Sequence, residues 1–389
     1  MKRRIIIVSV FFLGVSFCMG QNIQEQKRIM EAQKQAIVKP STKSATATNV
    51  SVGEWADAVY WEDGKCHKLS LPSGATDSRA SGIVVSNDVV YISGSYSTDG
   101  DDSKYFACYW KNGVIYKLSL PSGAKYPSTS GIAVSGDVIY IAGTYDIDDW
   151  HNSIPCYWRN GLIHNLSIPS GAKHPSTSGI AVSGDVVYIA GSYYDAQNNQ
   201  TACYWRNGVI NNLPLPSGVK ESYIGGITVS DDVLYIAGTY ITGDWNNGGK
   251  AIPCYWRNGV INNLTLPSGA DIWLYPNGNT NGITVVGDIV YIAGSYYNSD
   301  DVFPCYWRNS TLHDLSKTGY PQAMAIAVFD NIVHVAGSPS YSVASTICYW
   351  KNGVVQSWKI PTIFQKYVRI TGIVVSGNSV YIVATLWME

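Results

Sequence analysis

GIAVSGDVIYIAG, residues 131–143 of the 389-residue chain, has the pattern of two short strands joined by a tight turn. Apolar residues alternate with small ones on both sides of the Gly136-Asp137 turn, which is the period of a half-buried strand. A second segment, PCYWRNG (residues 155–161), follows as a third strand. Its Asn-Gly pair supplies the two positive-φ residues of a type I′ turn into a fourth strand. Together the two segments predict two hairpins, or four antiparallel strands.

Both segments recur seven times and alternate along the chain. The first begins at Gly82, Gly131, Gly179, Gly226, Gly282, Ala325 and Gly372, and the second carries a Tyr-Trp pair that ends at Trp61, Trp110, Trp158, Trp205, Trp256, Trp307 and Trp350. A four-stranded unit repeated every 43 to 51 residues is typical of a propeller blade. The sequence therefore predicts an all-β, seven-bladed β-propeller with four antiparallel strands per blade.

The chain ends predict how the last blade is completed. The repeats start with a lone Tyr-Trp hairpin, Ala58 to Leu71, and finish with a lone first hairpin, Gly372 to Trp387. We expect the two hairpins to share one sheet, since this removes the exposed edges of an open array. The repeat GIAVSGDVVYIAGSY (residues 179–193) resembles the first two strands of NHL and YWTD-type β-propellers. That resemblance implies a fold and no activity, because propellers host unrelated functions.

The first residues have the features of a secretion signal. Lys2, Arg3 and Arg4 precede a short apolar run that ends at Phe17, so residues 1–20 are predicted to be a signal peptide cleaved before Gln21. The protein is then secreted or periplasmic, and the alternative is an outer-membrane lipoprotein anchored at Cys18. Residues 21–50 form a polar spacer, partly helical or disordered, and residues 51–389 form the propeller.

Composition excludes several classes of partner. Charged residues make up 14% of the chain and the net charge is −1, so no electrostatic attraction to nucleic acid or to an anionic membrane surface is expected. No transmembrane segment is predicted in the mature chain, which we expect to be a monomer. Its partner would be an extracellular glycan or protein.

Most chemically reactive residues belong to the repeat, which favours a packing role for them. Six cysteines precede the Tyr-Trp pairs and are predicted to be reduced and buried: Cys108, Cys156, Cys203, Cys254, Cys305 and Cys348. No nucleophile or phosphate-binding motif is present. Two acidic groups, Asp99 to Asp102 and the trio Asp146, Asp148 and Asp149, lack the ligand spacing of an EF-hand loop. No cofactor is therefore predicted, with calcium as the alternative.

Candidate site residues lie in the connections of variable length, which fall on one face of the predicted ring. One cluster is Trp245, Trp273 and Tyr275 with Asp244 and Asn246, and a second is Asp149, Trp150 and His151. Such aromatic and polar groups suit a sugar ring or a peptide, although they would also serve merely to hold long loops.

Two functions are compatible with this face. The first is a non-catalytic binding module, and the alternative is a carbohydrate-active hydrolase or lyase. We expect no catalysis, because Gly, Ile, Ala and Val dominate the first strand of each blade and no pair of carboxylates is evident near the axis.

Overall fold

The computed structural model describes residues 56–98, 105–148, 152–243, 249–272, 280–298, 301–316, 321–338, 346–361 and 367–387. All of them belong to the second of two compact units, Ala45–Glu389, and the first unit is Met1–Ser44. Within these ranges the regular structure consists of 28 strands and no helix, which confirms the all-β prediction. It follows that no helix in the described part of the chain is long and apolar enough to cross a membrane.

Each internal repeat folds into an antiparallel sheet of four consecutive strands. The first three sheets contain β3 (Asp77–Ser86), β4 (Val89–Ser97), β5 (Tyr105–Lys111) and β6 (Val114–Lys117); β7 (Lys125–Ser135), β8 (Val138–Asp146), β9 (Ser153–Arg159) and β10 (Leu162–Asn165); and β11 (Lys173–Ser183), β12 (Val186–Tyr194), β13 (Gln200–Arg206) and β14 (Val209–Asn212). The next three contain β15 (Glu221–Ser230), β16 (Val233–Thr242), β17 (Lys250–Arg257) and β18 (Val260–Asn263); β19 (Thr280–Val286), β20 (Ile289–Asn298), β21 (Asp301–Arg308) and β22 (Thr311–Asp314); and β23 (Gln322–Phe329), β24 (Ile332–Ser338), β25 (Thr346–Lys351) and β26 (Val354–Lys359). One parallel bridge, Gln200 to Glu221, also joins β13 to β15.

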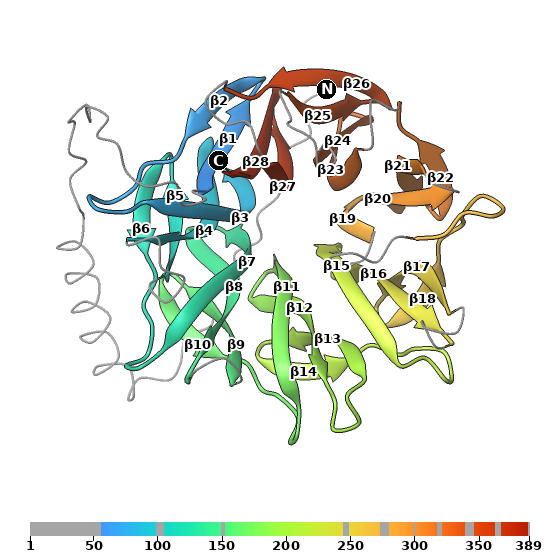
Figure 1. Ribbon diagram of the computed structural model, residues 1–389, viewed down its shortest axis with the longest axis horizontal. Helices are drawn as coiled ribbons and strands as arrows, with labels where there is room; N and C mark the ends of the chain where they lie inside the picture. The colour runs from blue at the N-terminus through green and yellow to red at the C-terminus, as the bar shows by residue number, and fades with distance from the viewer. Residues whose placement is uncertain are drawn as a thin grey trace, which may run out of the picture. The chain divides into compact units, whose positions relative to one another are not determined.

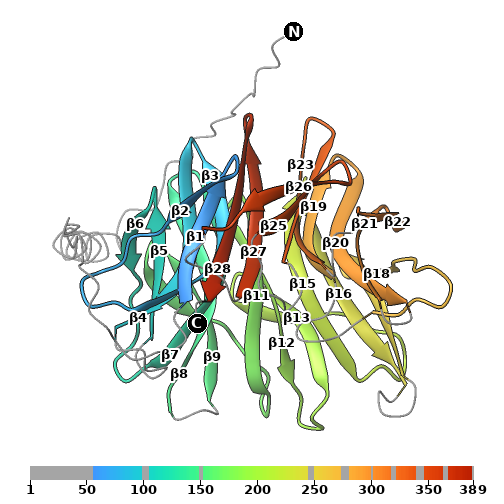
Figure 2. The same cartoon turned by 45° about the horizontal axis from the view of Figure 1, so that its top comes forward.

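A further sheet combines strands from both ends of the described chain. β1 (Ala56–Glu62) and β2 (Lys65–Lys68) pair with β27 (Tyr367–Ser376) and β28 (Ser379–Trp387) in the order β2-β1-β28-β27. In the β1–β28 ladder, Ala58 lies opposite Thr385 and Glu62 lies opposite Tyr381. Figure 2 shows β1 and β28 side by side.

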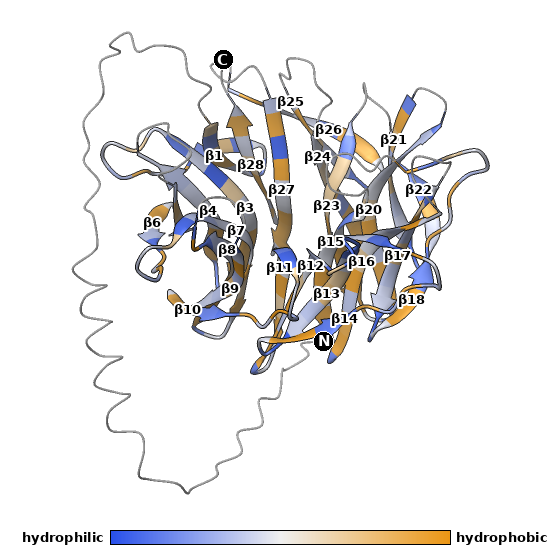
Figure 3. Cartoon of the chain, turned by 60° about the horizontal axis from the view of Figure 1, so that its bottom comes forward, coloured by the Kyte–Doolittle hydropathy of each residue, from blue (hydrophilic) through white to orange (hydrophobic). Residues whose placement is uncertain are grey.

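The first strand of each repeat faces a common axis (Figure 1). These innermost strands are β3, β7, β11, β15, β19, β23 and β27; each contacts the next, and β27 contacts β3. Figure 3 shows hydrophilic and hydrophobic bands alternating along β27, as the period-2 pattern of a strand requires. These strands therefore lie side by side around the axis.

The repeated tryptophans join neighbouring sheets. All seven are 0–1% exposed. Each indole N–H donates to a backbone oxygen of the preceding sheet's outer end: Trp61 to Lys359, Trp110 to Ser70, Trp158 to Ser119, Trp205 to Ser167, Trp256 to Pro214, Trp307 to Thr265 and Trp350 to Ser316, at 2.6–3.1 Å. A buried indole needs such a partner, so the repeat places a hydrogen bond at every sheet-to-sheet contact.

The Asn-Gly turns have the predicted backbone conformation. At Asn160 and Gly161, φ is 48° and 81°. The Asn160 side chain also accepts a hydrogen bond from the backbone N–H of Ile139 at 2.8 Å, which ties the turn to the second strand of its sheet. Asparagine thus tolerates the left-handed backbone and supplies a cross-strand contact.

The cysteines behave as small core residues. Each of the seven in the described part of the chain is a free thiol, and the six that precede Tyr-Trp pairs are buried, as predicted. Burial raises the pKa of Cys66 to about 11, and it raises the pKa values of Cys108, Cys156, Cys203, Cys254 and Cys305 well above the usual range, so none of these six is primed as a thiolate nucleophile.

Candidate functional site

The two loop clusters chosen from the sequence fall outside the described residues. This holds for Asp149, Trp150, His151, Asp244, Trp245, Asn246, Trp273 and Tyr275. The structure does describe the other two members of the acidic trio that includes Asp149. Asp146 accepts a hydrogen bond from Ser153 at 2.7 Å, and Asp148 accepts one from Asn152 at 2.6 Å. In the described ranges no three His, Cys, Asp or Glu side chains gather as a metal site would require.

A cavity of about 930 Å³ runs along the axis between the innermost strands. This size falls within the range of small-molecule sites. In all seven innermost strands the described lining ends at the isoleucine directly after the repeat Gly or Ala: Ile83, Ile132, Ile180, Ile227, Ile283, Ile326 and Ile373. Ile132, Ile180, Ile283 and Ile326 are also buried members of the hydrophobic cores between sheets, so the lining meets the core at this level.

Above the isoleucines lies a layer of hydroxyl groups. Ser81 lies 2.6 Å from the hydroxyl of Thr129, and Ser130 lies 2.8 Å from that of Thr177, so these side chains link adjacent innermost strands. Thr371 also lines the cavity, and its buried Oγ1 has no hydrogen-bond partner among the described residues. Serine and threonine oxygens both donate and accept, which suits a ligand rich in hydroxyl groups.

The rim of the cavity carries the charged side chains. Arg79 and Arg369 lie three residues before the repeat glycine of β3 and β27, and both line the cavity with exposed side chains. The equivalent positions of β7, β11 and β15 hold Ser128, Ser176 and Tyr223. Positive charge is therefore concentrated on two adjacent strands.

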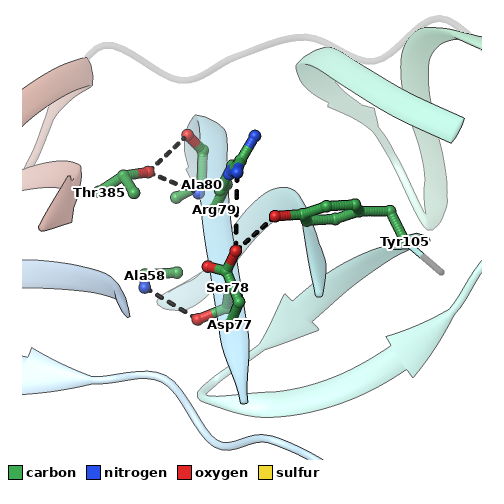
Figure 4. A network of polar contacts seen from close by, with 7 residues as sticks. All are labelled: Ala58, Asp77, Ser78, Arg79, Ala80, Tyr105 and Thr385. Atoms are coloured by element: carbon green, nitrogen blue, oxygen red, sulfur yellow. Dashed lines mark hydrogen bonds and ion pairs between the residues drawn. The ribbon is translucent and has the colours of Figure 1, made fainter. Parts of the chain in front are cut away.

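A buried carboxylate organises part of this rim (Figure 4). Asp77 is 6% exposed and accepts a hydrogen bond from the hydroxyl of Tyr105. The same carboxylate oxygen lies 3.6 Å from the Arg79 guanidinium, whose carbon lies 4.7 Å from the centre of the Tyr105 ring. The other Asp77 oxygen has no partner in the described part of the chain. Asp77 thus holds both an aromatic and a cationic side chain at the cavity.

Backbone contacts on either side keep this strand in place. Ser78 accepts a hydrogen bond from the Ala58 N–H at 2.9 Å, and Thr385 accepts one from the Ala80 N–H at 3.0 Å (Figure 4). Both bonds join β3 to the sheet that contains β1 and β28. The position of Arg79 therefore depends on the pairing of β1 with β28.

Aromatic residues complete the rim. Tyr105, Tyr126, Tyr223 and Trp387 all line the cavity and are half-buried. Tyr126 has φ of 47° in a bulge of β7 between Lys125 and Ser128. A bulky residue with positive φ is an outlier, and bulges redirect side chains beside functional sites. Burial and the nearby Glu221 raise the pKa of Tyr223 to about 12, so its hydroxyl is protonated at neutral pH.

The sequence interpretation missed this rim. It found no pair of carboxylates near the axis; the structure places single acids on two innermost strands, Asp77 on β3 and Glu221 at the start of β15, and neither is among the described lining residues. The available signal was charge: charged residues are scarce in the chain, and arginine occupies the position three residues before the repeat Gly or Ala only in β3 and β27. That Asp77, Arg79 and Tyr105 converge is a consequence of strand pairing, which the sequence pattern did not reveal.

No protein-family model matches the chain, and no curated protein matches it. Solved structures similar to it include β-propeller proteins. One is the β-propeller domain of the Trilobed protease from Pyrococcus furiosus, with 11% identity, 82% of this chain and 94% of that chain covered, and a TM-score of 0.49. A second is a prolyl endopeptidase, with 13% identity, 79% of this chain covered and a TM-score of 0.47. A third is a puromycin-hydrolysing peptidase of Mycobacterium tuberculosis, with 12% identity, 82% of this chain covered and a TM-score of 0.49. The match covers only 48% and 56% of those two peptidases.

Proposed function

We propose that this chain is a secreted, non-catalytic binding module that holds an extracellular glycan at the rim of its axial cavity. The observation that carries the proposal is the rim itself, where arginine and aromatic side chains surround an opening of small-molecule size. A concave site of this kind favours a glycan over a protein partner, whose interface would ordinarily spread over a wide, flatter surface.

The proposal includes a seven-bladed propeller closed by its chain ends. The four-stranded sheet of each repeat, the contacts between successive innermost strands and the β1–β28 pairing all support it. The basic and apolar start of the chain supports secretion. We also propose that the loop residues Trp245 and Trp273 extend the binding surface beyond the rim.

The known contacts of the acids favour binding over catalysis. Hydrolysis by paired carboxylates needs an acid and a second carboxylate flanking the scissile bond. At this rim Asp77 is engaged by Tyr105 and Arg79, and Asp146 is engaged by Ser153. The alternative, a carbohydrate-active hydrolase or lyase on the same face, predicts instead that saccharide products accumulate.

The test pairs a rim variant with a matched control. Binding of the mature protein to a glycan library is measured first, followed by calorimetry on the best ligand. Tyr126→Ala removes a rim aromatic and is expected to weaken binding about tenfold, whereas Tyr116→Ala, on the outer strand β6, leaves binding unchanged.

Four results would contradict the proposal. One is the absence of any glycan ligand, another is equal binding by the two tyrosine variants, and the third is release of shortened or unsaturated saccharides by the purified protein. Capture of a protein ligand that competes with no glycan would also count against it.

A further inference from the structure

Every innermost strand has an irregularity in its pairing at the same repeat position. In β3, Ala80 and Gly82 lie opposite consecutive residues of β4, so Ser81 between them is an extra residue without a partner. Five other innermost strands have a bulge at the equivalent point, and the pairing of β19 shifts between Thr280 and Ile283. The six extra residues all line the cavity, and we call them the bulge ring: Ser81, Ser130, Ser178, Gly225, Met324 and Thr371. Bulges redirect side chains beside functional sites, which makes this ring a candidate for ligand contact.

Hydroxyl groups of the bulge ring bond to the next innermost strand where that strand offers a hydroxyl. The side-chain oxygen of Ser81 lies 2.6 Å from that of Thr129, and the oxygen of Ser130 lies 2.8 Å from that of Thr177. In both pairs the threonine directly precedes the bulge residue of its own strand. A threonine at this position therefore satisfies the bulge residue of the strand before it.

Two bulge residues lack such a threonine. On β15, which contacts β11, the equivalent position holds Ile224, so Ser178 has no hydroxyl partner there. On β3, which contacts β27, it holds Ala80, and the buried oxygen of Thr371 has no hydrogen-bond partner in the described part of the chain. A buried hydroxyl without a partner is unfavourable, and rotation between the staggered positions of its side chain can turn it toward a ligand. Ser178 and Thr371 are thus the hydroxyl groups that the fold leaves to a ligand.

The chemistry of the bulge ring indicates an uncharged sugar residue. The ring consists of four hydroxyl side chains, one thioether and one glycine, so a charged group at its level would lose water without a charged partner in the ring. The hydroxyl groups lie on four successive strands, β27, β3, β7 and β11, whereas Gly225 and Met324 offer none. A sugar likewise combines hydroxyl groups at the edge of its ring with apolar C–H groups on its faces.

The strands around the cavity decide how a glycan reaches the bulge ring. Residues of all seven innermost strands line the cavity, each strand contacts the next, and β27 contacts β3. A ligand in this space of about 930 Å³ is surrounded by strands on its sides, so it enters along the axis. A glycan chain that lies across the opening does not reach the ring, whereas one of its ends does.

From these observations we propose that the axial cavity binds the terminal residue of a neutral glycan end-on, and that Ser178 and Thr371 bind its hydroxyl groups. The proposal rests on the proposed glycan-binding function and specifies which part of the glycan is bound.

Oligosaccharides blocked at one end test the end-on arrangement. The probes are cellotetraose, mannotetraose and galactotetraose, each with both ends free, with an aminobenzamide group on the reducing end, or with a benzylidene group on the non-reducing residue. Calorimetry on the mature protein is expected to show at least one tetrasaccharide that binds, and one of its blocked forms should bind about tenfold or more weakly because the added group clashes with the cavity wall. The other blocked form should bind like the free tetrasaccharide, since that end lies outside the cavity.

Two substitutions in the bulge ring locate the contact. Ser178→Met introduces the residue that β23 carries at the equivalent position, Met324, and should weaken binding about tenfold or more because the longer side chain occupies the place of the sugar. Thr371→Val keeps the shape of the side chain without its hydroxyl and should weaken binding about two- to tenfold. The melting temperature of Thr371→Val should not fall, because no described residue bonds to that hydroxyl; a structural role would lower it.

Ser135→Val is the matched control. Ser135 ends the innermost strand β7 outside the cavity lining, and β19 carries Val286 at the equivalent position. This variant is therefore expected to fold and to bind like the parent protein.

The outcomes separate this proposal from the function on which it rests. Equal affinity for the free tetrasaccharide and both blocked forms would overturn end-on binding, and ring variants that bind as well as Ser135→Val would overturn the assigned contacts; glycan binding at the rim would stand in both cases. If the three tetrasaccharides fail to bind while other glycans of the library do, this proposal alone is wrong. If no glycan of the library binds, both proposals are wrong.

Discussion

Removal of the last fifteen residues tests the joining of the two chain ends directly. Deleting residues 375–389 eliminates β28, which pairs with β1 on one side and with β27 on the other. The hairpin β1–β2 then loses its connection to the inner strand of its sheet. Truncation of a poorly ordered terminus removes few contacts and has little effect on stability, whereas this truncation removes a central strand of a sheet.

The buried residues of β28 set the expected magnitude. Val380 is 7% exposed, and Ile382, Val383 and Leu386 are each 0% exposed. Burial of one aliphatic side chain contributes about 1.5–3 kcal/mol to the free energy of unfolding, so the loss of these four lowers it by about 6–12 kcal/mol. A folded domain is stable by only about 5–15 kcal/mol in total. We therefore expect the truncated chain to lose cooperative folding at room temperature.

Thermal melting followed by circular dichroism, together with limited proteolysis, measures the loss. Deletion of residues 21–44 is the control and is expected to leave the melting temperature unchanged. Leu386→Ala provides a variant that still folds, with a predicted cost of about 2–5 kcal/mol and a melting temperature lower by several degrees. Val209→Ala, at a side chain 64% exposed on β14, should have no measurable effect.

A complementation experiment tests whether the loss of stability comes from the missing strand β28. A synthetic peptide of residues 375–389 added to the truncated chain is expected to restore protease resistance by strand addition to the open edge of β1. The reasoning is refuted if the truncated protein keeps the parent melting temperature, or if Leu386→Ala is as stable as Val209→Ala.

Further variants test other parts of the argument. Gly191→Ala should destabilise the protein by about 1–3 kcal/mol in urea titration, because the new Cβ would lie 2.0 Å from the backbone oxygen of Ser176; an unchanged midpoint would count against this packing. Burial lowers the pKa of His334 to about 4, below its unfolded value of about 6.5, so the stability that the neutral ring contributes is complete above pH 6.5 and falls as the pH drops toward 4. His334→Tyr should remove that part of the acid sensitivity, which urea midpoints at pH 5 and pH 7.5 will measure. Thiol titration of the mature protein should find few reactive cysteines before unfolding and seven afterwards, and the recovery of two disulfides would contradict this. Replacing Trp245 and Trp273 together by Ala should weaken glycan binding roughly tenfold without changing the melting temperature; a lower melting temperature would indicate a loop-holding role instead.

The strands and turns were predictable because they depend on local chemistry. Alternation of apolar residues specifies which side of a strand is buried, and Asn160-Gly161 specifies a turn whose two residues both have positive φ. Repetition strengthened this inference, since seven copies of one pattern leave little ambiguity about element type. The burial of Cys156 and its equivalents followed from the same pattern, because a residue beside a core tryptophan has the same neighbours in every repeat.

The rim of the cavity was decided by tertiary structure alone. Arg79 and Arg369 are far apart in the sequence, and they line the same cavity because β27 contacts β3. Asp77 acquires its role from Tyr105 on a different strand, at a distance that no sequence period encodes. The residues chosen from the loops lie outside the described ranges, so their part in binding stays a prediction. Repeat patterns specify how a residue packs within its own sheet, whereas a binding site depends on which sheets meet, and that is determined only when the whole chain has folded.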